Sequence, residues 1–208
     1  VTSVTGETSL KATEKLTFVP SDVTFNNNLT IAEGTGLVEV NHLTVNGDAI
    51  INSNGKTTIK TATVQGDLTT DTNELEVVNK LTVTGTSNLT TAGVLKLGTA
   101  EFTGVTINSG SADITSLTAT GTANITVTND FTAKDVTINN LNNLSANNIT
   151  IDNLNVTNDA TIVSDGNVVL GKTTIGNDFN ASAKNLTFNG VTSVTGETSL
   201  KATEKLTF

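Results

Sequence analysis

The chain has 208 residues, a formal net charge of −9, and no cysteine, methionine, tryptophan or tyrosine. The lack of cysteine excludes disulfide bonds and thiolate metal sites, and an acidic chain lacks the clustered Lys and Arg with which proteins bind nucleic-acid phosphates. No apolar run approaches the length of a transmembrane helix, and no ten-residue window shows apolar residues at sustained helical spacing. We therefore expect an all-β chain that neither binds nucleic acid nor inserts into a membrane.

A four-residue phrase recurs along the chain, first clearly as Thr44-Val45-Asn46-Gly47. Its second position is apolar in every copy, as an inward-facing strand residue should be. Its last position is always Gly or Asn, the residues that most easily adopt positive φ, which predicts a left-handed corner there. The ten predicted corner residues are Asn27, Gly47, Gly66, Gly85, Gly104, Gly121, Asn140, Asn158, Asn177 and Gly196.

The spacing of this phrase predicts a coiling chain. From Thr24 to Ser193 the copies are 20, 19, 19, 19, 17, 19, 18, 19 and 19 residues apart. Residues 191–208 also repeat residues 1–18 letter for letter, an offset of 190. We interpret residues 1–208 as one continuous array with a super-repeat of 190 residues (1–190), about ten coils of 19 residues, that starts again at residue 191.

Each coil is predicted to contain three short strands whose alternate residues point inward. Three sets of inward pairs follow, beginning at Val23/Phe25, Leu29/Ile31 and Leu16/Phe18. Three strands per turn predict a right-handed, roughly triangular parallel β-solenoid of about eleven coils, without caps at either end. The inward residues expected for one whole coil are Leu37, Val40, Leu43, Val45, Ala49 and Ile51.

Coils near 19 residues with strands of the Leu-Thr-Val type and Gly or Asn corners resemble the β-solenoid shafts of filamentous-haemagglutinin-like and autotransporter adhesins. The resemblance covers the whole chain and depends on periodicity and residue class. It implies an extracellular shaft of a large secreted protein.

The polar residues favour a structural protein over an enzyme. His42 is the only histidine, so we expect no two-histidine metal site and no histidine-based triad, and we expect His42 to be an exposed corner residue. Arginine is absent and the lysines are scattered, unlike the clustered charges of polysaccharide-cleaving solenoids. Carboxylates recur just after the corner, but calcium needs six to eight converging oxygens, so we expect solvated structural groups and name no catalytic, cofactor or metal residue. These carboxylates are Asp48, Asp67, Asp159 and Asp178.

The outward face of the first strand set is rich in threonine, including the pairs Thr82/Thr84 and Thr118/Thr120. A flat Thr-x-Thr array is what β-solenoid ice-binding proteins present, so ice binding is the alternative function. Threonine is also simply a good outward strand residue, and Gln65, Glu101 and Gly176 interrupt the array. Asn-x-Ser/Thr sequons, acceptors for glycans in secreted proteins, occur at Asn28, Asn88, Asn124, Asn143, Asn148, Asn155, Asn180 and Asn185.

The verbatim duplication indicates the function that we expect. It predicts either a longer polypeptide that carries 190-residue blocks in tandem or identical units that stack end to end. The partner would then be the protein itself, and the function would be that of a structural extracellular fibre, surface filament or adhesin shaft.

Overall fold

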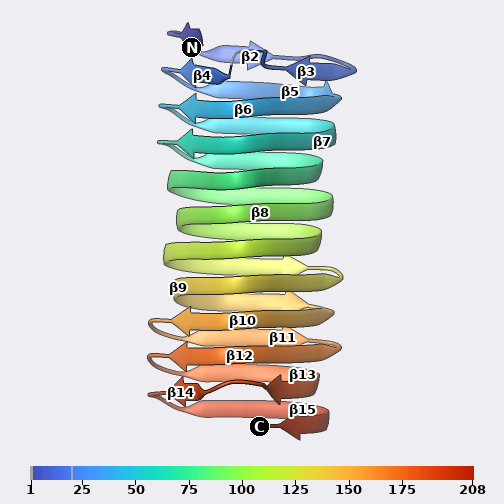
Figure 1. Cartoon of the computed structure of the whole chain (residues 1–208), viewed down its shortest axis with the longest axis vertical. Coiled ribbons are helices and arrows are strands. Elements are labelled where there is room, and N and C mark those ends of the chain that lie inside the picture. The colour runs from blue at the N-terminus through green and yellow to red at the C-terminus, as the bar shows by residue number, and fades with distance from the viewer. Residues whose placement is uncertain (1, 20) are drawn as a thin grey trace.

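The structure is a computed structural model that describes residues 2–19 and 21–208. These residues form a right-handed parallel β-solenoid of about eleven turns (Figure 1). They contain no helix, and every strand pairing among them is parallel. The strands are β1 (Thr2–Val4), β2 (Thr8–Leu10), β3 (Lys15–Thr17), β4 (Asp22–Phe25), β5 (Leu29–Thr35), β6 (Leu37–Val45), β7 (Ala49–Val64), β8 (Leu68–Val127), β9 (Asp130–Ala146), β10 (Asn148–Val156), β11 (Ala160–Ser164), β12 (Asn167–Ile175), β13 (Phe179–Phe188), β14 (Thr192–Val194) and β15 (Thr198–Thr207).

The register between coils confirms the predicted period. Thr24 lies opposite Thr44, which lies opposite Thr63, and Thr63 lies opposite Thr82. The same position continues lower in the stack from Thr118 through Thr137 and Asn155 to Thr174 and Ser193. Because like positions pair, each coil repeats the hydrogen-bonding pattern of the one before it.

Three ladders recur in each turn, as the sequence predicts. Between β6 and β7, Val38–Val40 pair with Thr57–Ile59, and His42–Val45 pair with Thr61–Val64. Between β7 and β8, Ala49–Ser53 pair with Leu68–Thr72. Long strands such as β8 run through several corners because the pairing continues around them, so one strand covers more than one face (Figure 1).

The core is the column of inward side chains enclosed by the coils. The predicted pairs of the first ladder are buried from Val23/Phe25 to Thr173/Ile175. In the terminal coils Leu16, Phe18, Leu200 and Ala202 are only partly buried, because a neighbouring coil covers them on one side. A coil therefore depends on both neighbours to bury its interior.

One inward assignment was wrong, and the register between two correctly inward pairs was offset. Leu37 is 43% exposed, whereas Val38 and Val40 are buried, because strict alternation in β6 turns residues 38 and 40 inward. Leu144 lies opposite Ile162, so the predicted pairs Leu144/Ala146 and Ala160/Ile162 are offset by one inward position. The second ladder of these coils has three inward positions. The predicted pair in one coil covered the last two of them, and the predicted pair in the next coil covered the first two.

A small defect lies within the core near the fourth coil. A cavity of about 10 Å³ is lined by residues that include Ala62, Leu68 and Thr70. The hydroxyl of Thr70 is buried and makes no hydrogen bond with the residues that the structure describes. A buried hydroxyl without a partner retains its desolvation cost, so Thr70 is a weak point of the core.

Replacing Thr70 with Val should raise the free energy of unfolding by roughly 1 kcal/mol, because the shape is kept and the unpaired hydroxyl is removed. The control is Thr35→Val, since the buried Thr35 hydroxyl donates to the carbonyl of Ala32 at 2.7 Å. That variant should be destabilised by a similar amount. Urea denaturation of both variants measures the difference, and equal effects would contradict the assignment.

Candidate functional surfaces

The corner carboxylates lie on one edge of the stack and bond to backbone. The Oδ1 atom of Asp48 accepts a hydrogen bond from the backbone N–H of Asp67 at 2.8 Å, and Asp67 Oδ1 accepts from the N–H of Thr86 at 2.7 Å. Asn28 makes the same bond to the N–H of Asp48, so the interaction does not require a charge. Asp159 and Asp178 repeat it one coil apart, to the N–H groups of Asp178 and Glu197. These side chains join successive coils.

This ladder explains the corner glycines, and the predicted dihedral angles were wrong. Among the described residues only Gly34 has positive φ, at 78°, and none of the ten predicted corner residues does. The glycine is required instead because the adjacent coil lies too close to leave room for a side chain. A Cβ at Gly85 would lie 2.6 Å from the carbonyl oxygen of Gly66 and would also overlap the Asp67 carboxylate, since the carboxylate that bonds the next coil fills the space.

Gly104 provides a matched comparison within the same set. The nearest atom to a Cβ there is the carbonyl oxygen of Thr122, at 3.6 Å. Gly85→Ala should therefore lower the free energy of unfolding by roughly 1–3 kcal/mol, as overpacking does. Gly104→Ala should leave it unchanged or slightly raised, because alanine restricts the unfolded chain more than glycine does.

Chemical denaturation of the two glycine variants tests this explanation. Equal losses at Gly85 and Gly104 would show that glycine is needed for its backbone angle and not for its lack of a side chain.

Several side chains on the outward face of the first ladder bond to the neighbouring coil. Asn46 Nδ2 donates to Asn26 Oδ1 at 3.1 Å, and Asn26 Nδ2 donates to Ser3 Oγ at 3.0 Å. The Thr103 hydroxyl donates to the carbonyl of Thr84 at 2.6 Å. Glu101, which interrupts the threonine column, pairs with Lys80 at 2.8 Å. These polar groups are thus directed along the axis, toward neighbouring coils.

An ice-binding surface needs a regular array of free hydroxyls, and on this face Glu101 and the bonded amides interrupt the array. We therefore expect the folded chain to show no thermal hysteresis and no shaping of ice crystals. Nanolitre osmometry of the full chain measures both. A hysteresis gap that disappears when Thr82, Thr84, Thr118 and Thr120 are replaced by bulky residues would instead establish the alternative function.

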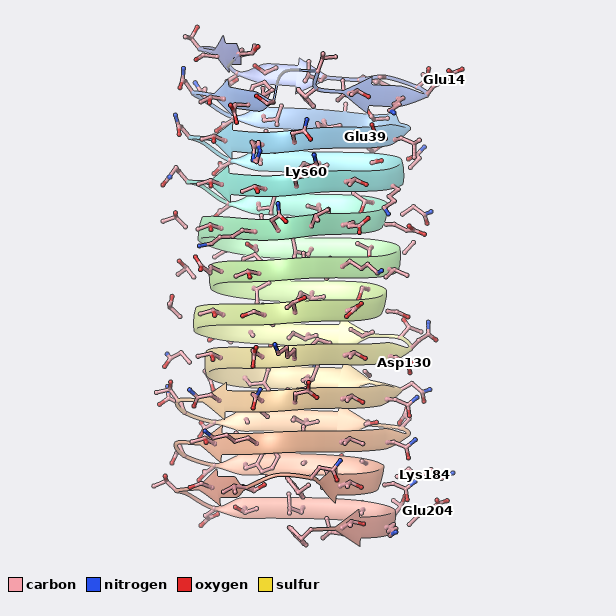
Figure 2. All side chains as sticks on the ribbon, viewed as in Figure 1. Glu14, Glu39, Lys60, Asp130, Lys184 and Glu204 are labelled. Carbon is pink, nitrogen blue, oxygen red and sulfur yellow. The ribbon has the colours of Figure 1, made fainter. Side chains whose placement is uncertain are left out.

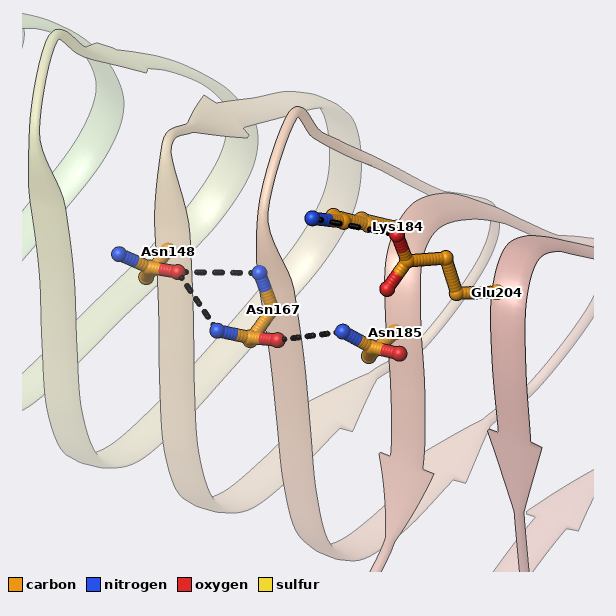
Figure 3. Close-up of polar contacts among 5 residues, drawn as sticks. All are labelled: Asn148, Asn167, Lys184, Asn185 and Glu204. Carbon is orange, nitrogen blue, oxygen red and sulfur yellow. Dashed lines mark hydrogen bonds and ion pairs between the residues drawn. The ribbon is translucent and has the colours of Figure 1, made fainter.

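A second polar column, made mainly of asparagines, runs along another corner (Figure 3). Asn148 Nδ2 donates to Asp130 Oδ1 at 2.9 Å, and Asn148 Oδ1 accepts from both the N–H and the side-chain amide of Asn167, at 3.0 and 3.1 Å. Asn185 Nδ2 continues the column to Asn167 Oδ1 at 2.9 Å. Two of these residues, Asn148 and Asn185, belong to sequons, and a glycan there would have to displace the amide hydrogen bond.

Ion pairs also link adjacent coils on the outer surface, as Lys184 and Glu204 do at 3.2 Å (Figure 2). Lys56 and Glu76 pair at 2.5 Å, and Lys15 and Glu39 at 2.8 Å. The hydrogen bond from Lys56 lowers the pKa of Glu76 despite some desolvation, and Glu76 raises the pKa of Lys56. The lowered carboxylate pKa means that the pair's contribution is present at neutral pH and is lost as the pH falls through that pKa. The contribution is small, because both side chains are substantially exposed.

The remaining candidates do not come together into one site. His42 is exposed at the start of a ladder segment, opposite Asp22 and Thr61, as its position in the sequence predicts. The described residues contain no group of three His, Cys, Asp or Glu side chains placed to hold a metal ion. In the same part of the chain, there is no helix that is long and apolar enough to cross a membrane.

In comparisons with known proteins, no family model, curated protein or solved structure matches the chain.

Proposed function

We propose that the chain belongs to a structural extracellular fibre, surface filament or adhesin shaft in which 190-residue solenoid blocks continue one another. The arrangement of the duplicated segment carries this proposal. Strands β1, β2 and β3 lie within residues 2–18, and strands β14 and β15 lie at the equivalent positions within the identical residues 192–208. Adding 190 to each residue of β1 and β2 gives a residue of β14 or β15.

The two copies pair through opposite edges. The first copy pairs with the coil that follows it, with Thr2 opposite Val23 and Thr8 opposite Leu29. The second copy pairs with the coil that precedes it, with Thr192 opposite Thr173 and Thr198 opposite Phe179. One sequence therefore fits between residues 173–188 on one side and residues 22–39 on the other. A chain in which residue 191 restarts residue 1 would continue the ladder without a break.

Mechanical function fits the way in which the surface is used. Carboxylates, asparagine amides and ion pairs all link one coil to the next along the axis. Such bonds stiffen a rod. The resemblance to secreted adhesin shafts supports an extracellular location, and a surface-exposed shaft would be labelled by antibodies on intact cells of the source organism.

A chain of two blocks, residues 1–190 followed by residues 1–208, should form one straight rod. With ten coils per block and about 4.8 Å per coil, the second block should add about 48 Å to the axial length. Small-angle X-ray scattering of one-block and two-block chains measures this increment. Two rods joined by a flexible hinge would contradict the proposal, because the junction would then not be a normal coil.

A further inference from the structure

We propose that the coil of residues 173–190 is a docking site for residues 1–18 of a second copy of this chain, which adds head to tail. This inference rests on the proposed function in one respect only: both take residue 191 as the start of a new block. The identity of the occupant follows from the structure, because residues 191–208, which have the sequence of residues 1–18, already lie on that coil.

Several specific contacts hold the segment at this site. Lys184 pairs with Glu204 at 3.2 Å (Figure 3). The ring of Phe188 stacks on that of Phe208 with centroids 5.4 Å apart. Asp178 Oδ1 accepts the backbone N–H of Glu197 at 2.8 Å. In a docked second copy, the groups of Glu204, Phe208 and Glu197 would be supplied by its Glu14, Phe18 and Glu7.

Gly6 and Gly196 show the same residue in two environments. A Cβ at Gly196 would lie 2.7 Å from the carbonyl carbon of Asn177 and would overlap the Asp178 carboxylate. A Cβ at Gly6 would meet no described atom within 4 Å, and neither residue has positive φ. None of the described residues thus occupies the space that a side chain at position 6 would take. Docking on a coil that presents Asp178 does require a glycine there.

The opposite edge of the same segment uses different side chains. In the first copy Lys15 pairs with Glu39 at 2.8 Å, and Phe18 meets Phe25 edge-on with centroids 6.0 Å apart. Glu14, the counterpart of Glu204, is left for the docking edge (Figure 2). One coil can therefore make both ion pairs at once. Because its glutamate pairs with the preceding coil and its lysine with the following coil, the copies would stack in one direction only.

In the full chain the site is occupied by residues 191–208, so a second copy must displace them. The two segments are identical, and the tethered one is favoured by its high effective concentration. Gly196→Val in the first chain should remove this advantage, because the substituted segment clashes at Asn177 and Asp178 while the incoming Gly6 does not.

Disulfide trapping between two full-length chains tests the docking, since the native chain contains no cysteine. The first chain carries Gly196→Val and Thr187→Cys, and the second carries Thr17→Cys. Thr187 lies opposite Thr207, the counterpart of Thr17, so mild oxidation should give a disulfide-linked heterodimer. Adding Gly6→Val to the second chain should reduce its yield about tenfold or more, as a loss of about 1.4 kcal/mol in binding would.

Two controls separate docking from other effects. Val169→Cys in place of Thr187→Cys lies one coil away from the expected partner and should not cross-link. Gly6→Val alone should leave the melting temperature of the full chain unchanged. Should it lower that temperature, charge reversal decides: Lys184→Glu in the first chain should reduce the yield, and Glu14→Lys in the second should restore it.

The inference is overturned by an absence of heterodimer, by equal yields with and without Gly6→Val in stable chains, or by cross-linking at position 169. A two-block chain that forms one rod while the separate chains fail to cross-link would confine the junction to covalent tandems. That result would overturn the docking inference and leave the proposed function standing.

Discussion

The parallel backbone ladder between successive coils is the interaction on which this structure depends. Because each residue pairs with the residue about 19 positions away, like side chains stack on like along the axis. An inward apolar side chain therefore packs against the equivalent apolar side chains of the adjacent coils. In the same way, an asparagine lies within hydrogen-bonding distance of another amide or of a carboxylate. The core, the polar columns and the ion pairs are consequences of this one repeat, as expected for a quasi-one-dimensional fold.

Stacking also imposes a limit on the corners, where backbone of one coil comes close to backbone of the next. Asp67 uses this closeness to bond the N–H of Thr86, and Gly85 leaves the space that the carboxylate needs. The carboxylate and the glycine therefore act together, since the carboxylate occupies the space that a side chain would need. Asn28 performs the same role as Asp48 without a charge, so the acidity of the chain at this edge is not what the corner requires.

The period, the parallel pairing and the inward pairs of the first ladder could be predicted because they depend on which residue types recur at which spacing. Position within a coil was harder to predict. Leu37 appeared inward because it is apolar, whereas alternation from Val38 and Val40 decides its orientation. The corner angles were wrong for a different reason: Gly and Asn at one position suggest positive φ, and a sequence does not show that the neighbouring coil lies too close for a side chain. The Asn148–Asn167–Asn185 column was missed, although a spacing of 18 to 19 residues between asparagines was a visible signal.

A repeat fold of this kind separates what makes a coil stable from what makes it join another coil. Within the stack every coil packs against the coil before it and the coil after it, so its sequence must be compatible with both neighbours. The duplicated segment satisfies the preceding coil at one end of the chain and the following coil at the other, with Glu204 serving one edge and Lys15 the other. Gly6 is the residue at which these two demands can be distinguished, because only one of them needs a glycine there. The proposed fibre would therefore need no special connecting structure, since two blocks would join through the same surface as any two coils.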